Sequence, residues 1–174
     1  MFKHRRIPFG ADNFLSVLEG FEGGFAIFAG IIIGLSFEGV DRRLLIITAG
    51  ISIIVNAVNA SAVRYSSEHY IDELDGQENR KWLSGYFVPA VIEFLVYGIA
   101  SIISILPLLF IESDFLAVVA MTGVTLFLLF AIGWYRGNLL LGIHRVRDGI
   151  EVAGLGLLII TMGAGSGWLL SHLV

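Results

Sequence analysis

Five long apolar stretches constrain what this chain can fold into more than any other feature. Each contains about 20 residues or more, and a helix that rises ~1.5 Å per residue needs about that length to cross a hydrocarbon core ~30 Å thick. The stretches are apolar nearly all round, whereas a helix on the surface of a soluble domain has one polar face. The sequence therefore predicts an all-α polytopic membrane protein with five transmembrane helices, over residues 14–37, 44–65, 86–111, 115–135 and 152–173.

The composition agrees with a single transmembrane domain over residues 1–174. Hydrophobic residues make up 56% of the chain and the mean hydropathy is +0.84, both above the usual balance of a soluble domain. Cysteine is absent, which excludes disulfides and thiolate metal sites. We find no nucleotide-binding loop, catalytic triad or zinc-binding helix motif, and we expect neither an enzyme nor a nucleic-acid-binding protein.

The basic residues indicate how the predicted helices are oriented. If five spans alternate in direction, nine of the 11 Lys and Arg residues fall on one side and two on the other. The positive-inside rule places the richer side in the cytoplasm, which predicts a cytoplasmic N-terminus and an external C-terminus. The polar segment Ser66–Leu83 then lies in the cytoplasm, and it is predicted to continue the second helix to near Gly76. The nine are Lys3, Arg5, Arg6, Arg64, Arg80, Lys81, Arg136, Arg145 and Arg147, and the two are Arg42 and Arg43.

Polar residues inside three of the predicted spans share one depth. At ~1.5 Å per residue from the cytoplasmic ends, Glu19 and Glu22 lie about 7–12 Å into the first span and Glu93 about 10 Å into the third. Asn56 and Asn59 lie about 9–14 Å into the second span by the same rise. A carboxylate in lipid costs at least ~2.5 kcal/mol, so such residues normally face a protein interior and mark a path for ions or protons.

The oxygen atoms of these side chains predict a site for a divalent cation such as Fe²⁺, Mn²⁺ or Mg²⁺, or for protons. Structural interpretations compete with this one. Hydrogen bonds between helices explain the two amides equally well, and pairing with Arg64 or a backbone group would explain Glu22 and Glu93. The candidate metal ligands are Glu19, Glu22, Asn56, Asn59 and Glu93.

Arg64 lies near the cytoplasmic end of the second span, where an unpaired cation would repel divalent ions. We predict that a carboxylate neutralises it, either Glu68 one helical turn along or Glu22 across the helix pair. Glu19 and Glu22 together also predict assembly, because a single five-helix chain would struggle to shield two carboxylates from lipid. A symmetric homodimer that buries the first helix is therefore expected.

Three segments carry a resemblance to a known family. Residues 19–30 read EGFEGGFAIFAG, residues 49–67 run from Ala49-Gly50 to Arg64-Tyr65-Ser66-Ser67, and residues 149–170 include most of the last span. In these segments the chain resembles the vacuolar iron transporter family. The family has five spans, is dimeric and moves Fe²⁺ or Mn²⁺ out of the cytosol in exchange for protons.

Individual positions follow this family in part. Glu19 falls on its essential pore aspartate and keeps a carboxylate. Ala60 falls on its pore methionine, Arg64 on a glutamate at the cytoplasmic end of the second helix, and Asn59 on a serine. Plant-type members carry a metal-binding domain between the second and third spans, and Ser66–Leu83 is too short to hold one.

The resemblance implies a homodimeric exporter of a divalent cation, iron or manganese, that works by proton antiport and has no resident cofactor. It would lie in the cell membrane of a prokaryote or in the vacuolar membrane of a eukaryote. A non-transporting assembly or regulatory protein of the same fold is the alternative, which Ala60 and Arg64 favour. A membrane enzyme that uses the carboxylates as acid and base has the least support, because no nucleophile or histidine is placed near them.

Overall fold

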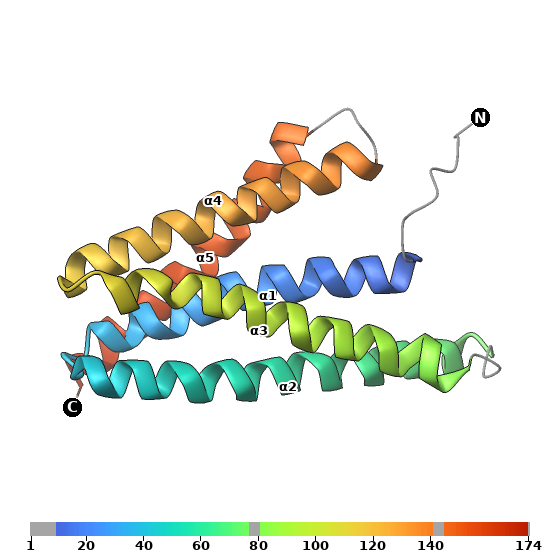
Figure 1. Ribbon diagram of the computed structural model, residues 1–174, viewed down its shortest axis with the longest axis horizontal. Helices are drawn as coiled ribbons and strands as arrows, with labels where there is room; N and C mark the ends of the chain where they lie inside the picture. The colour runs from blue at the N-terminus through green and yellow to red at the C-terminus, as the bar shows by residue number, and fades with distance from the viewer. Residues whose placement is uncertain (1–9, 77–80, 141–144, 174) are drawn as a thin grey trace.

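The computed structural model describes residues 10–76, 81–140 and 145–173, and in these residues it contains five long helices and no strand. One π-helical turn, η1, leads directly into the third long helix. Figure 1 shows α1 in the middle of the bundle, with α4 above it and α2 below it, while α3 and α5 run obliquely across it. The elements are α1 (Ala11–Ser36), α2 (Arg42–Leu74), η1 (Leu83–Phe87), α3 (Val88–Phe110), α4 (Asp114–Leu140) and α5 (Arg145–Ser171).

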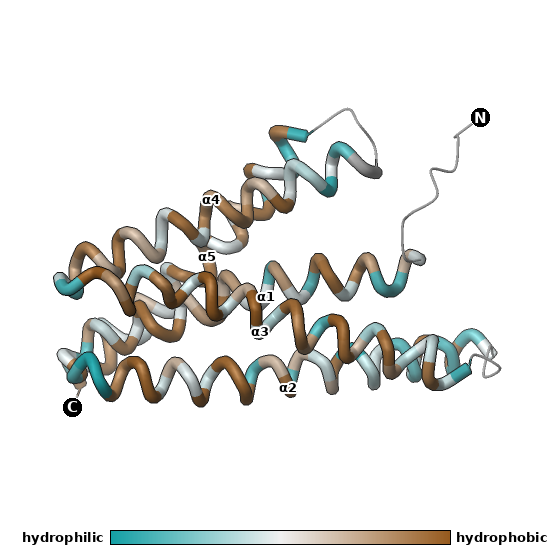
Figure 2. The backbone as a smooth tube through the Cα atoms, viewed as in Figure 1, coloured by the Kyte–Doolittle hydropathy of each residue, from teal (hydrophilic) through white to brown (hydrophobic). Residues whose placement is uncertain are grey.

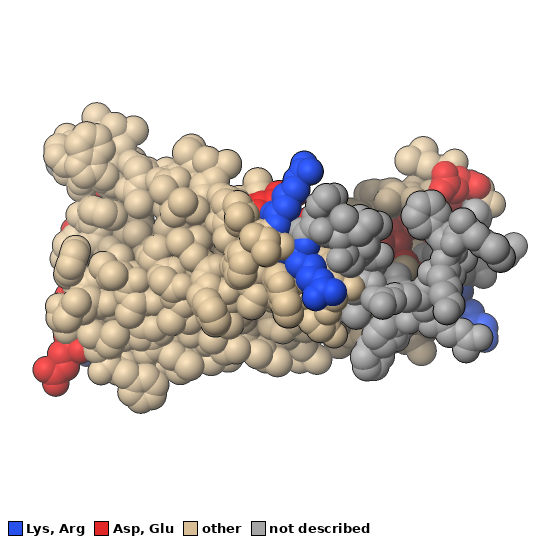
Figure 3. Space-filling model, turned by 90° about the horizontal axis from the view of Figure 1, so that it is seen from above, with Lys and Arg blue, Asp and Glu red and all other residues tan. Residues whose placement is uncertain are grey.

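The five helices of the described residues are each long and apolar enough to cross a membrane. Hydrophobic residues follow the helices through the middle of the bundle, and hydrophilic residues gather toward its two ends (Figure 2). In the space-filling view of Figure 3, one half of the visible surface is almost uncharged, and Lys and Arg side chains appear in the other half. The prediction of an all-α membrane protein with five transmembrane helices is confirmed. The side of the membrane that the N-terminus faces stays a prediction.

The helical segments begin before the predicted spans, with η1 counted into the third, and α2 and α4 also end after them, because helical hydrogen bonding continues into polar sequence beyond the apolar boundary. The longest is α2, with 33 residues, and its part beyond residue 65 is largely polar. It ends at Leu74, and Gly76 follows with a φ of 66°, so the predicted end near Gly76 is confirmed. The π-helical turn that starts at Leu83 was not predicted, and it begins the third span earlier than expected.

The central helix is α1. Most of its apolar stretch is buried inside the protein, whereas less than a quarter of the apolar stretch of α2, α4 or α5 is buried. It packs against every other long helix, through clusters that include Phe28, Ile32 and Met121 near one end and Phe25 and Leu129 farther along. This central position fixes the polar residues of α1 relative to all four neighbouring helices.

Glycines allow α1 and α5 to touch backbone to backbone. A Cβ atom at Gly34 would come within 2.6 Å of the carbonyl oxygen of Gly163. A Cβ atom at Gly167 would overlap the carbonyl oxygen of Gly34, and one at Gly163 would overlap that of Gly30. A backbone carbonyl group cannot turn aside as a side chain can, so this close crossing depends on small residues from both helices.

Gly167→Ala is expected to destabilise the protein by about 1–3 kcal/mol, because the added methyl group overlaps the backbone of α1. Gly165→Ala is the matched control, since a Cβ atom there meets nothing within 4 Å. That control is expected to be neutral or up to ~1 kcal/mol stabilising, because Ala favours the helix. Thermal unfolding in detergent compares the two, and equal melting temperatures would contradict the close contact between α1 and α5.

Arg42 at the start of α2 holds the turn between α3 and α4. Its Nη1 atom donates to the carbonyl oxygen of Glu112 at 2.9 Å, and its Nη2 atom donates to that of Ile111 at 2.7 Å and to that of Leu108. Nη1 also lies 3.3 Å from Oδ1 of Asp114. Carbonyl groups at a helix C-terminus lack helical partners and attract cations. The guanidinium group therefore ties three helices together at this end of the bundle.

Candidate functional site

Three helices bring charged side chains together around one pocket of about 290 Å³. Glu19 comes from α1, Arg64 from α2 and Glu93 from α3, and Tyr97 of α3 lies beside them. Two of the three predicted carboxylates therefore share a single space with the predicted counter-cation. We call this space the inner pocket, and its lining residues are Glu19, Gly23, Ile27, Ala60, Val63, Arg64, Ser67, Glu93 and Tyr97.

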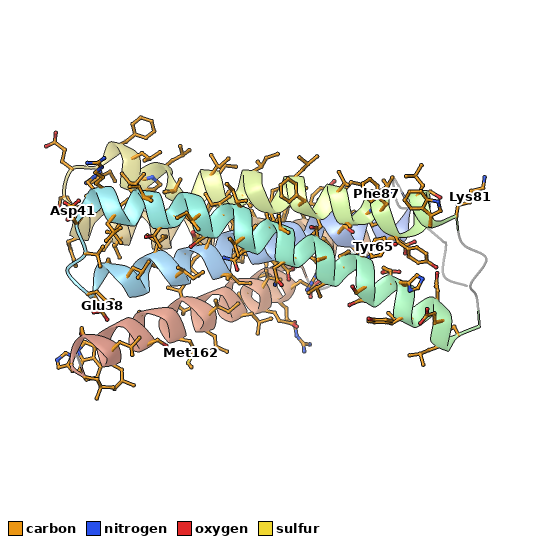
Figure 4. All side chains as sticks on the ribbon, turned by 90° about the horizontal axis from the view of Figure 1, so that it is seen from below. Glu38, Asp41, Tyr65, Lys81, Phe87 and Met162 are labelled. Atoms are coloured by element: carbon orange, nitrogen blue, oxygen red, sulfur yellow. The ribbon has the colours of Figure 1, made fainter. Side chains whose placement is uncertain are left out.

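The inner pocket lies toward the end of the bundle where α2 approaches η1. Figure 4 shows Tyr65, the next residue after the pocket arginine, in the half of the molecule that also carries Phe87 and Lys81. Glu38 and Asp41 lie at the opposite end. In the predicted orientation the half with Lys81 is the cytoplasmic one, so the pocket would be reached from the cytosol.

Close packing of α1 on α3 positions the pocket side chains. A Cβ atom at Gly20 would lie 3.0 Å from the carbonyl oxygen of Glu93, and one at Gly24 would lie 2.5 Å from that of Tyr97. A Cβ atom at Gly23 would lie 2.9 Å from the Tyr97 ring. The three glycines thus let the two backbones approach at the level of Glu19, and this approach is what brings the carboxylates of α1 and α3 near each other.

Arg64 joins α2 to α1. Its Nη1 atom lies 3.0 Å from Oε2 of Glu19, and its Nη2 atom lies 2.8 Å from Oε1 of Glu68 and donates to the carbonyl oxygen of Asp12 at 3.2 Å. The arginine side chain is only 6% exposed. The predicted pairing with Glu68 is confirmed, and the suggested alternative partner Glu22 is wrong. The pairing with Glu19 was not predicted, because it depends on how α1 is rotated about its axis.

Glu22 has a different arginine near it. Its Oε1 atom lies 3.6 Å from Nη1 of Arg136 on α4, too far for a hydrogen bond, and no donor contacts this buried oxygen. Glu22 and Glu19 line a second hollow of about 380 Å³ between α1, α4 and α5, which we call the side pocket. Glu19 lines both pockets, so its carboxylate stands between the two spaces.

Glu93 and Tyr97 bring two polar atoms without partners into the inner pocket. Glu93 is 6% exposed and its Oε2 atom has no hydrogen-bond partner, and the hydroxyl of Tyr97, which is 2% exposed, has none either. Buried polar groups in proteins are almost always hydrogen-bonded, so two exceptions in one pocket need an explanation. Tyr97 was not predicted as a site residue, although its spacing of four residues from Glu93 places both side chains on the same face of a helix.

The two predicted asparagines do not join the pocket. Asn56 donates from Nδ2 to the carbonyl oxygen of Ser52 in its own helix at 2.9 Å. Asn59 is exposed on α2 and lines neither the inner nor the side pocket. Their predicted depth placed them at the level of the carboxylates, but neither lies on the part of α2 that lines a pocket. Ala60 is the residue of this turn that lines the inner pocket.

The arrangement favours positive charge. Among the residues that the structure describes, no three His, Cys, Asp or Glu side chains are grouped so as to hold a metal ion by themselves. A divalent cation held by Glu19 would have Glu22 as a second carboxylate in the side pocket, and water would complete its coordination, while Glu93 and the hydroxyl of Tyr97 lie beside Glu19 in the inner pocket. Two carboxylates face one guanidinium group there, so the pocket can accept a cation or a proton.

Comparison of the chain with protein families, curated proteins and solved structures finds no match in any of the three. The fold and the site define a class: a five-helix membrane protein with an acidic pocket inside the bundle and a buried arginine in that pocket. The function therefore has to be argued from the site.

Proposed function

We propose that the protein is a membrane transporter that exports a divalent metal ion, iron or manganese, from the cytosol in exchange for protons. The observation that carries this proposal is the buried carboxylate of Glu93, which has an oxygen atom without a hydrogen-bond partner and lines a pocket inside the bundle. Burying an unsatisfied charged group is expensive, and acidic residues inside transmembrane helices generally mark ion or proton paths.

The carboxylates have different roles in this proposal. Glu19 and Glu22 share the side pocket and bind the cation, since carboxylate oxygens are the ligands that hard divalent ions prefer. Glu93 lies across the inner pocket from Arg64 and takes part in proton exchange. Because Glu19 lines both pockets, a positive charge near Glu93 weakens cation binding at Glu19 through space. Asn56 and Asn59 have no role in this version of the site.

We also propose that the transporter is a homodimer with a cytoplasmic N-terminus, in the cell membrane of a prokaryote or the vacuolar membrane of a eukaryote. The side chains of Glu19 and Glu22 remain 42% and 35% exposed beside the apolar side pocket. A second copy that covers this face would remove both carboxylates from lipid. Arg64 and Arg136 already supply part of the shielding, so the residual exposure is what supports a dimer.

Growth in the presence of metal tests the transport proposal. Cells that express the protein are expected to grow at Mn²⁺ concentrations that stop cells carrying an empty vector, because export lowers the cytosolic concentration. The same comparison with Fe²⁺ separates the two candidate metals. Equal sensitivity of expressing and control cells, with the protein confirmed in the membrane, would contradict metal export.

The alternative is a non-transporting assembly or regulatory protein. The observation in its favour is that Glu19 and Glu22 each have an arginine nearby, Arg64 at 3.0 Å from Glu19 and Arg136 at 3.6 Å from Glu22. In this alternative the charges hold α1 in register with α2 and α4. Neutralising one member of a pair would then lower stability, and the growth of cells in metal would not depend on the protein.

A further inference from the structure

Arg64 occupies the position against Glu19 that a transported cation would need. Its Nη1 atom lies 3.0 Å from Oε2 of Glu19, and the guanidinium group lines the inner pocket with it. Arginine keeps its charge at all ordinary pH values, so Glu19 has a positive partner even when the pocket holds no ion. A metal ion and this guanidinium group would compete for the same carboxylate.

The surroundings of Arg64 give the guanidinium group somewhere to go. Glu68, one helical turn along α2, holds its Nη2 atom at 2.8 Å and belongs to the same helix. Across the inner pocket, Oε2 of Glu93 has no hydrogen-bond partner, and neither has Nε of Arg64. If the guanidinium group leaves Glu19, it keeps one carboxylate and gains access to another. Breaking an ordinary buried ion pair is costly because it leaves a buried charge without a partner. The movement of Arg64 from Glu19 toward Glu93 leaves the guanidinium group with a carboxylate partner throughout.

We propose that Arg64 is a tethered counter-cation: it neutralises Glu19 while the site is empty, and an arriving cation displaces it toward Glu68 and Glu93. This inference rests on the proposed transport function and adds how its site is controlled. The displaced guanidinium group weakens cation binding and lets the ion leave again. The competition with Arg64 also favours divalent over monovalent ions. A monovalent ion only replaces the single positive charge of the guanidinium group beside Glu19, whereas a divalent ion brings two.

Two simpler roles for Arg64 make different predictions. As a purely structural bridge between α1 and α2, Arg64 would affect stability and leave cation affinity unchanged. As a fixed positive charge, it would repel cations whatever its partners, and removing Glu68 would act independently of Arg64. In the tethered role, Glu68 acts only through Arg64, because it draws the guanidinium group away from Glu19.

Isothermal titration of the purified protein with Mn²⁺ distinguishes these roles. Arg64→Gln is expected to tighten Mn²⁺ binding about ten-fold or more, and Glu68→Gln to weaken it about five-fold. In the double variant the effect of Glu68→Gln should vanish, leaving an affinity within about two-fold of Arg64→Gln alone. Arg43→Gln removes a charge from an exposed residue at the opposite end of α2 and is the matched control, with no expected change.

Arg64→Lys provides a second variant in case Arg64→Gln does not fold. A lysine keeps the charge but lacks the forked guanidinium group that contacts two carboxylates at once, so Mn²⁺ should bind about three-fold tighter than in the wild type. Unchanged or weaker binding in the Arg64 variants, or an undiminished Glu68→Gln effect in the double variant, overturns the tethered counter-cation. Absence of Mn²⁺ and Fe²⁺ binding in both the wild type and a folded Arg64→Gln overturns the transport proposal itself.

Discussion

Glu19→Gln is expected to abolish metal flux while the protein stays folded. The amide keeps the shape of the side chain and removes the charge that attracts the cation, which should lower flux at least about 100-fold, or ~2.7 kcal/mol. Arg64 is not left unpaired, because Glu68 at 2.8 Å and the carbonyl oxygen of Asp12 at 3.2 Å still hold it. Flux into proteoliposomes and the melting temperature are measured on the same preparation.

Glu38→Gln is the matched control for this variant. Glu38 is exposed in the turn after α1, at the end of the bundle away from the inner pocket (Figure 4). Its loss of charge is expected to leave both flux and stability unchanged. Wild-type flux through Glu19→Gln would end the assignment of Glu19 to the cation site. Retained flux together with a lower melting temperature would show that the Glu19–Arg64 pair is a structural bridge.

Glu93→Gln is expected to slow metal flux about ten-fold and to raise the melting temperature. A ten-fold change corresponds to about 1.4 kcal/mol. This effect is smaller than that of Glu19→Gln because Glu93 takes part in proton exchange and does not bind the cation directly. The stabilisation follows because Glu93 is buried and its Oε2 atom has no hydrogen-bond partner, and a neutral amide costs less to bury than a charge. A carboxylate that lowers the stability of the protein in this way is expected at a position where the protein needs it for function.

Glu151→Gln serves as the control for Glu93→Gln. Glu151 is exposed near the start of α5 and lines neither the inner nor the side pocket. The control should change neither flux nor melting temperature. If Glu93→Gln melted at a lower temperature than the wild type and carried metal normally, the carboxylate would be a structural group, and the proposal built on it would fail.

The fold could be predicted from the sequence because membrane spans are set by length and hydropathy, which are local properties. The extension of α2 to Leu74 was equally readable, since its polar residues follow the apolar stretch without a proline or glycine until Gly76. The π-helical turn at Leu83–Phe87 was not, because its residues carry no distinctive pattern. The close contacts that the glycines of α1 make with α3 and α5 depend on how the helices pack, which their spacing along one helix does not fix.

For the candidate site, the sequence could predict how far along each helix a polar side chain lies, but not which way it faces. A helical rise of ~1.5 Å per residue gives the level of each polar side chain, and Glu19 and Glu93 do share a pocket at that level. The direction around each helix depends on packing against its neighbours, which sequence spacing does not fix. Asn59 therefore does not line the inner pocket, although the next residue, Ala60, does. The approach of Arg136 to Glu22 was missed for the same reason, since it required α4 to lie beside α1.

Two of the positions where the sequence departs from the predicted family resemblance lie in the same place. Ala60 and Arg64 are one helical turn apart on α2, and both line the inner pocket. Where the family has a thioether and a carboxylate, this chain has a methyl group and a guanidinium group. In the proposed exporter, the cation would bind without a soft sulfur ligand and against an internal positive charge.

Simultaneous recording of metal uptake and internal pH in proteoliposomes tests the transport proposal most directly. We expect Fe²⁺ or Mn²⁺ to enter faster than Ca²⁺ or Co²⁺, with protons leaving as the metal enters, and we expect both signals to disappear in Glu19→Gln. The result that would contradict metal–proton exchange is uptake no faster than in protein-free liposomes, measured on folded wild-type protein that is shown to be inserted in the membrane.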